Sequence, residues 1–112
     1  MSTLTQFSGG GVRQIQTGYL SNVVATAAGT GEEQFYLDIT VSAITNTTKC
    51  VIQFDGAANI GGFSYPFYFF NSTTQTYIPT TKILNSTTLR IMCRTSGSTP
   101  YFNGRWTITE YN

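Results

Sequence analysis

The sequence predicts an all-β, single-domain protein, an antiparallel β-sandwich of jelly-roll-like type, with a small β-barrel as the alternative. Three observations favour this fold class. Apolar and polar residues alternate with a period of two through much of the chain, and no stretch repeats apolar residues at helical spacing. Clusters of Gly, Asn, Ser or Pro also separate the alternating segments at short intervals. A chain of 112 residues is long enough to bury one core.

The clearest predicted strand runs from Gln34 to Val41, with Phe35 and the odd-numbered residues after it on the core face. The next begins at Lys49, turns Cys50, Ile52 and Phe54 inward, and ends at Asp55-Gly56, a strong turn signal.

Two further strands are well defined. In Leu89–Arg94, alternation turns Leu89, Ile91 and Cys93 inward and leaves Arg90, Met92 and Arg94 outward. A last strand runs from Trp106 to the C-terminus, with Trp106 and Ile108 opposed to Thr107, Thr109 and Tyr111. Weaker strands are predicted over 12–17, 19–26, 64–70 and 76–84, which gives seven or eight in all.

The chain divides into a flexible N-terminal arm, residues 1–11, and a β-sandwich domain, residues 12–112. The arm ends in Gly9, Gly10 and Gly11, and because no GK[ST] sequence or helix pattern follows, these glycines form a linker rather than a phosphate loop. The first residues lack a basic region followed by an apolar segment, so we expect synthesis in the cytoplasm without a secretion signal. No apolar run approaches the roughly 20 residues of a membrane helix.

The composition argues against several function classes. A formal net charge of +1 is too small for the phosphate neutralisation on which nucleic-acid binding depends. The chain has no histidine, which removes nucleophilic triads and most general-base designs. A paired-carboxylate site could be built from Glu32, Glu33, Asp38, Asp55 and Glu110. It is weakly supported, because the two adjacent glutamates lie in a Gly-flanked loop, Asp38 alternates onto a polar strand face and Asp55 has a sufficient role in a turn. We therefore expect no enzymatic activity and no cofactor.

The two cysteines, Cys50 and Cys93, cannot complete a tetrahedral metal site in a chain without histidine. We favour buried thiols, with an intramolecular disulfide or a bond to another subunit as the alternatives. Asn46, Asn71 and Asn85 each begin an Asn-x-Ser/Thr sequence, which in so Asn-, Ser- and Thr-rich a chain indicates turn chemistry more than glycosylation.

The run 63–70 is apolar on both faces of a strand, so a partner is expected to cover the outer one. Pro66 within it indicates an edge or a bulge. We favour a subunit interface; a strand that turns a corner between two sheets and a sugar-stacking platform remain the alternatives. The binding candidates of this run are Tyr65, Phe67, Tyr68, Phe69 and Phe70.

A second cluster near the C-terminus contributes Tyr101 and Phe102 as interface candidates, beside Trp106, which we expect in the core. Arg90 and Arg94 fall on one strand face, where they could bind acidic groups of a partner or simply face solvent. Arg13, directly after the glycines, completes the candidate arm with Gly9, Gly10 and Gly11.

The segment Phe7–Gly18, with three glycines followed by Val-Arg-Gln-Ile-Gln-Thr-Gly, resembles a family of small tailed-bacteriophage proteins. These begin with a glycine run and an Ile/Val-Lys/Arg-x-Ile-Gln-x-Gly strand. The closing segment Trp106–Asn112 is similar to the family's last strand, which ends in Glu and an aromatic residue. Thr48–Gly56 lies where the family carries a core strand. The two cysteines and the run 63–70 depart from the pattern.

The resemblance implies a bacteriophage virion protein, made in the host cytoplasm, of the tail-fibre-like or structural class, with no catalytic residue to carry over. We expect it to decorate the capsid or attach to the neck or tail through contacts with other virion proteins and with itself, a homotrimer being favoured. The alternative is a receptor-binding head of a tail fibre that binds a cell-surface glycan. Neither function involves nucleic acid or a membrane.

Overall fold

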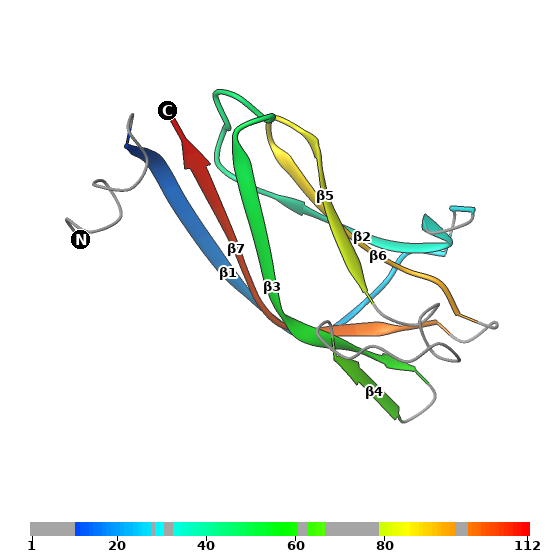
Figure 1. Ribbon diagram of the computed structural model, residues 1–112. Helices are drawn as coiled ribbons and strands as arrows, with labels where there is room; N and C mark the ends of the chain where they lie inside the picture. Colours follow the sequence, from blue (N-terminus) through cyan, green and yellow to red (C-terminus); the bar gives the residue numbers. More distant parts are fainter. Residues whose placement is uncertain (1–10, 28, 31–32, 61–62, 67–78, 96–98) are drawn as a thin grey trace.

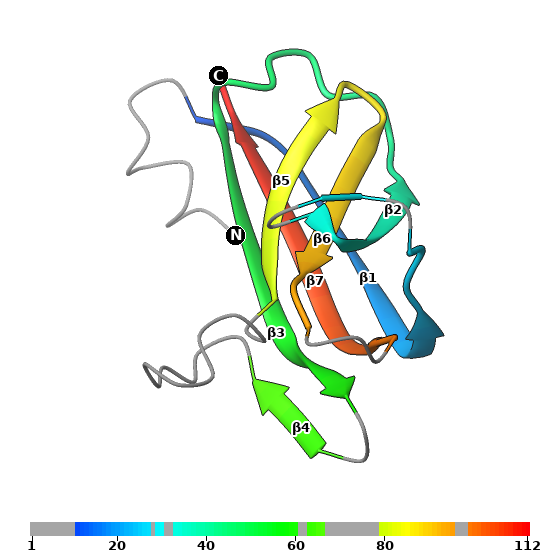
Figure 2. The same cartoon turned by 90° about the vertical axis from the view of Figure 1, so that its right-hand side faces the viewer.

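The computed structural model describes residues 11–27, 29–30, 33–60, 63–66, 79–95 and 99–112. These residues form two antiparallel sheets that face each other, so the predicted β-sandwich is confirmed (Figure 1). Sheet A has the order β1 (Val12–Val24), β7 (Tyr101–Tyr111), β3 (Cys50–Ile60) and β4 (Phe63–Pro66). Sheet B has the order β2 (Phe35–Thr40), β6 (Thr88–Cys93) and β5 (Thr80–Asn85), and Figure 2 looks onto it with sheet A behind.

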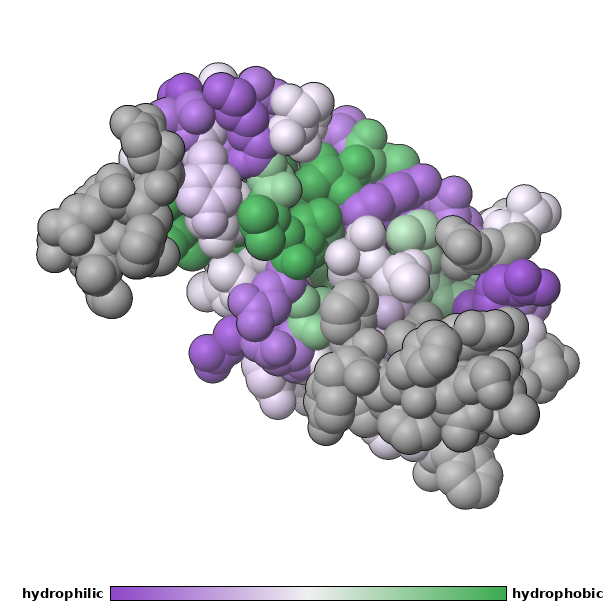
Figure 3. Space-filling model, viewed as in Figure 1, coloured by the Kyte–Doolittle hydropathy of each residue, from purple (hydrophilic) through white to green (hydrophobic). Residues whose placement is uncertain are grey.

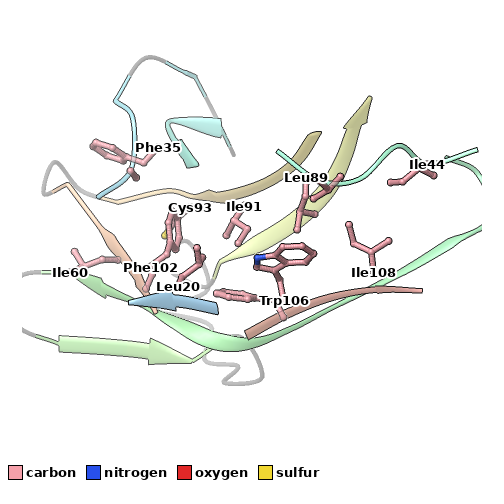
Figure 4. Close-up of a cluster of buried hydrophobic side chains, with 14 residues drawn as sticks. Leu20, Phe35, Ile44, Ile60, Leu89, Ile91, Cys93, Phe102, Trp106 and Ile108 are labelled. Carbon is pink, nitrogen blue, oxygen red and sulfur yellow. The ribbon is translucent and has the colours of Figure 1, made fainter. Parts of the chain in front are cut away.

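The core lies between the two sheets, where the inward faces of β2, β3, β6 and β7 meet (Figure 4). Leu89, Ile91 and Phe102 are completely buried, and Phe54 and Ile108 are nearly so. Each large apolar side chain removed from water contributes about 1.5–3 kcal/mol. The whole cluster is Leu20, Ala25, Phe35, Val41, Ile44, Phe54, Ala58, Ile60, Leu89, Ile91, Cys93, Phe102, Trp106 and Ile108.

Trp106 is accommodated by a glycine in the neighbouring strand. Gly18 of β1 lies opposite Trp106 of β7, and a Cβ atom at Gly18 would lie 2.5 Å from the indole ring. The indole therefore occupies the space that a side chain at position 18 would need. This explains why Trp106, expected in the core, is only 7% exposed.

The strands β3 and β7 bend along their length (Figure 1), and they pair at two opposed glycines, Gly56 and Gly104. Gly104 has φ +132°, and a Cβ there would lie 2.3 Å from Gly56 Cα. The prediction that Asp55-Gly56 ends a strand is wrong, because β3 continues to Ile60. Glycine serves here for close approach of two backbones and not for a turn.

β1 is one strand of 13 residues and not the two that the sequence predicted. Its pairing with β7 shifts between Leu20 and Val23, where Asn22 has φ 54°. The side-chain oxygen Oδ1 of Asn103 accepts a hydrogen bond from the Asn22 backbone N–H at 2.6 Å. The predicted break at Gly18 is therefore wrong, because Gly18 pairs regularly with Trp106, and the irregularity of β1 is a bulge further along, fixed by a side chain of the neighbouring strand.

Two of the three Asn-x-Ser/Thr sequences form turns, as predicted. Asn46 Oδ1 accepts hydrogen bonds from the backbone N–H and the hydroxyl of Thr48, at 3.0 and 2.6 Å. Asn85 Oδ1 does the same with Thr87, at 3.0 and 3.2 Å, and this turn joins β5 to β6. Asn71 lies outside the described residues.

Candidate interaction surface

The outward side of sheet A presents three neighbouring strands in matched rows. Their register gives four rows across β1, β7 and β3, and we call these twelve residues the outer face. In row order, the rows are Val12, Tyr111 and Lys49; Ile15, Thr109 and Val51; Thr17, Thr107 and Gln53; and Tyr19, Arg105 and Asp55. The third row is tied together by Thr17, whose hydroxyl lies 3.3 Å from that of Thr107.

Large apolar and aromatic side chains of the outer face are exposed. Ile15 is 50%, Val51 56% and Tyr19 71% exposed, on strands where the alternate positions point toward sheet B. Figure 3 shows a different hydrophobic area, between β3 and β5 at the side of the sandwich where the two sheets face each other. Scattered exposed apolar residues are ordinary, but a group in adjacent strands marks a surface suited to contact with another macromolecule.

The charges of the outer face are at its two ends. Lys49 lies in the first row, and Arg105 and Asp55 lie side by side in the fourth. Within the described part of the chain, none of these three side chains takes part in an ion pair. They therefore remain available to a partner.

Sheet B carries the opposite arrangement, an outward cluster in which the charges neutralise one another. Arg90 of β6 binds both carboxylate oxygens of Asp38 in β2, at 2.7 and 2.9 Å, and Glu33 at 2.6 Å. Its guanidinium also lies 4.1 Å from the centre of the Tyr36 ring. Lys82 adds a second contact to Glu33 at 3.1 Å. The hydrogen bonds from Arg90 lower the pKa of both carboxyl groups.

This cluster shows where the Arg90 side chain is bound within the chain. Arg90 is engaged by two carboxylates and an aromatic ring, so its guanidinium has little capacity left for a partner. Arg94 lies just beyond β6 and is exposed. The prediction that Met92 points into solvent is wrong: its register places it between Tyr36 and Thr80, yet only 5% of it is exposed.

A buried carboxylate fastens one end of the sandwich. Glu110 of β7 has no exposed surface, and its oxygens accept hydrogen bonds from Gln14 Nε2 and the Asn46 backbone N–H, each at 2.8 Å. Arg13 Nε lies 3.6 Å from the same carboxylate. The hydrogen bond from Gln14 is the main cause that lowers the pKa of Glu110, opposed by burial and assisted by backbone donors and by Arg13.

Two glutamine side chains hold the neighbouring loop 41–49 against β1. Gln14 Nε2 also donates to the Ala43 carbonyl at 2.9 Å. Gln16 forms a two-way link with Ser42, donating to its carbonyl at 3.0 Å and accepting from its N–H at 2.8 Å. The loop is therefore connected to sheet A mainly by polar side chains that reach its backbone.

Acid is expected to weaken the fold, with Glu110 as a main cause. A carboxyl whose pKa is lowered in the folded state stabilises the fold above its ordinary pKa of 4.5, and this stabilisation is lost as pH falls below that value. Urea unfolding followed from pH 7 to pH 3 should show a falling midpoint. Glu110→Gln should be less stable at pH 7 and lose less on acidification.

The matched control for this measurement is Glu33→Gln, the same substitution in the ionic cluster of sheet B. The Glu33 side chain is 34% exposed, so solvent screens its ion pairs and its variant should change the pH dependence less. Equal pH dependence of wild type and Glu110→Gln would contradict the assignment.

The remaining predicted site residues are spread over the molecule. Tyr101 lies beyond the bend of sheet A and is 42% exposed, whereas Phe102 is fully buried in the core. Tyr65 belongs to β4, opposite Ala58. Phe67, Tyr68, Phe69 and Phe70 lie outside the described residues, and so do Gly9 and Gly10. Gly11, φ 83°, accepts a hydrogen bond from the Asn112 N–H at 3.1 Å, and Arg13 next to it contacts Glu110.

Both cysteines are thiols, in different sheets: Cys50 begins β3 and Cys93 ends β6. Burial raises the pKa of Cys93 to about 12. Burial is also the main cause that raises the pKa of Cys50, assisted by the charge of Glu110. Both therefore stay protonated at neutral pH, where a thiol is a poor nucleophile.

The described residues contain no group of three or more Cys, Asp or Glu side chains placed to hold a metal ion. Nor do they include a helix of the length and apolar character needed to span a bilayer.

Fold and surface together define a small two-layer antiparallel β-sandwich with one outward sheet face open to contact. Comparison of the chain with protein families, with curated proteins and with solved structures finds no match.

Proposed function

We propose that the protein is a non-enzymatic structural component of a bacteriophage virion, which decorates the capsid or attaches to the neck or tail through subunit contacts. The observation that carries the proposal is the outer face of sheet A. It exposes Ile15, Tyr19 and Val51 across neighbouring strands, together with charges that have no partner among the described residues. Such a surface suits assembly better than isolation in water.

The resemblance to small tailed-phage proteins bears on this same surface. Its three segments, 7–18, 48–56 and 106–112, are far apart in the sequence. Their described parts lie in β1, β3 and β7, which are adjacent strands of sheet A (Figure 1). Segments that resemble the phage proteins therefore supply most of the outer face.

The carboxylates support a non-enzymatic role. Glu110 accepts hydrogen bonds in a closed site, while Glu33 and Asp38 are bound to Arg90. Each of these acids has a structural partner, and its pKa is lowered, whereas a general acid needs a raised one.

In this proposal, the arm formed by residues 1–11 tethers the sandwich to neighbouring virion proteins, and subunit contacts complete the assembly. The homotrimer favoured by the phage resemblance, with the aromatic run 67–70 at its interface, is the assembly proposed within the particle and is separate from any contact made by the outer face. The chain reaches the virion after synthesis in the host cytoplasm.

Purified particles of the phage that encodes this chain provide the test. Quantitative mass spectrometry should find the protein in the particles at a fixed ratio to the major capsid protein. A copy number in the hundreds indicates capsid decoration, whereas a neck or tail component is present in tens. Absence of the chain from washed particles would refute the proposal.

A glycan-binding tail-fibre head is the second candidate, and one observation favours it. Tyr19, the most exposed large apolar or aromatic side chain described, adjoins Arg105 and Asp55 in one row. An aromatic ring beside charged hydrogen-bonding groups is suited to a sugar ring. Binding of host glycans that Tyr19→Ala abolishes, with a copy number in tens, would favour this candidate.

A further inference from the structure

We infer that the outer face of sheet A binds the outer face of a second copy of this chain, about a two-fold axis that crosses the strands. The inference names the partner of the surface invoked in the proposed function, and it rests on that proposal in treating this surface as a subunit contact. Most contacts between identical subunits are two-fold, so the same patch must be complementary to itself.

The axis determines which rows meet. Consider a two-fold axis that lies in the contact plane and runs perpendicular to the strands. Rotation about this axis places each strand of one copy on the same strand of the other copy, with the opposite chain direction. The first row of one copy then faces the fourth row of the other, and the second faces the third. The four rows of the outer face can therefore be tested for complementarity position by position.

The end rows match in charge and in ring chemistry. Lys49 of one copy faces Asp55 of the other, which forms an ion pair twice across the axis. Tyr111 faces Arg105, an arrangement suited to a cation–π contact. Tyr19 faces the start of β1, where the pairing with β7 shifts between Val12 and Gln14, so the most exposed ring meets the half-buried Val12 and the exposed Arg13. Each of these contacts occurs twice in the pair.

The middle rows contain no charge. Ile15 faces Thr17, Thr109 faces Thr107, and Val51 faces Gln53. These are mainly β-branched side chains, which pack well on a pleated surface. The exposed Ile15 and Val51 are thereby removed from water near the centre of the contact, where burial contributes most to binding.

The other two-fold arrangement is much poorer. An axis parallel to the strands keeps each row on its own row and places β1 over β3. Arg105 then faces Arg105, two like charges, and Lys49 faces Val12 instead of Asp55. Like charges set opposite each other are unfavourable, so the charge pattern selects the axis across the strands.

The size of the face is sufficient for a modest interface. Three strands about 4.8 Å apart and about seven residues long cover roughly 14 by 24 Å. The two copies together then bury on the order of 700 Å², which is in the range of weak, transient contacts. We therefore expect a dimer that dissociates on dilution.

Charge reversal tests the pairing with the full chain. Analytical ultracentrifugation should find wild type at twice the chain mass of 12.3 kDa at high concentration. Lys49→Glu and Asp55→Lys should each raise the dissociation constant at least about tenfold, because each creates two repulsive contacts. Both side chains are exposed, and circular dichroism checks that the variants fold.

The decisive measurement is a mixture of the two variants. In a two-fold pair of Lys49→Glu with Asp55→Lys, both contacts join opposite charges again, so the mixture should dimerise although neither variant does alone. The double variant should dimerise by itself. Arg94→Glu, the same kind of charge change beyond sheet B, should leave the dissociation constant unchanged.

Three outcomes would overturn the inference. These are a wild-type monomer at all concentrations, a mixture that remains monomeric, or a trimer that the reversals do not affect. Incorporation into particles is measured separately, so a chain that enters the virion without dimerising contradicts this inference alone. A dimer absent from particles contradicts only the virion assignment.

Discussion

Gly104→Ala is expected to destabilise the protein by about 3 kcal/mol or more, because the substitution combines backbone strain with overlap in a closed space. Position 104 has φ +132°, which L side chains rarely adopt, and the added Cβ would lie 2.3 Å from Gly56 Cα and 2.4 Å from the Asp55 carbonyl oxygen. These are backbone atoms, so no rotamer change relieves the contact. Urea unfolding at pH 7, with Trp106 fluorescence as the signal, measures the loss.

Thr109→Ala is the matched control for Gly104→Ala. It lies on β7 as well, in the outer face, where the lost methyl and hydroxyl are partly exposed. We expect it to cost less than about 1 kcal/mol. If the two variants were equally stable, the close approach of the β3 and β7 backbones at Gly56 and Gly104 would be contradicted.

Phe102→Ala should cost about 3–5 kcal/mol, the usual effect of deleting a buried ring. Phe102 has no exposed surface and packs in the core between the sheets. Its neighbour Tyr101, 42% exposed on the other face of β7, provides the control, and Tyr101→Ala should cost about 1 kcal/mol or less. Thermal and urea unfolding of the pair compare the two faces of one strand.

This comparison also separates two roles that the sequence could not distinguish. Both residues were interface candidates, because adjacent aromatic residues at the start of a strand do not reveal which one faces the core. A small effect of Phe102→Ala on stability, with a large one on assembly, would restore it as an interface residue.

Period-two alternation predicted side-chain orientation correctly in strands that have one face in the core and the other in solvent. It correctly placed Phe35 and Val41 on the core side of the strand that became β2, and it turned Leu89 and Ile91 inward in β6. Alternation did not predict the structure at Gly56, because turns and close contacts between the backbones of paired strands both favour glycine. Only the opposing Gly104, 48 positions later, distinguishes the two.

The sequence did not predict the outer face, because in β1 the polar glutamines point inward and the apolar Ile15 points outward, the reverse of the usual pattern. Gln14 and Gln16 point toward loop 41–49, and Ile15 between them points outward. The reason lies 26 to 29 residues away, in backbone groups of the loop that hydrogen-bond to the two glutamine side chains. A single sequence does not show that these groups will lie beside β1.

The burial of Glu110 could have been predicted from the same alternation. This residue has the parity of Trp106 and Ile108, so alternation places it on the core face. A carboxylate among core positions indicates a buried polar site, and a surrounding set of donors is then required. The sequence did not reveal the donors, because Gln14 and Asn46 belong to distant segments.

The attachment of loop 41–49 has a consequence for how its sequence can vary. Gln14, Gln16 and Glu110 bind the loop through main-chain atoms of residues 42, 43 and 46, which every residue type except proline at a donor position supplies. The side chains at Ser42, Ala43 and Thr47 project outward and are exposed. The loop's path is thus determined by β1 and β7 together with its own buried Val41 and Ile44. Its exposed positions are open to replacement, so a short epitope or reactive group could be displayed there while the sandwich keeps its two layers.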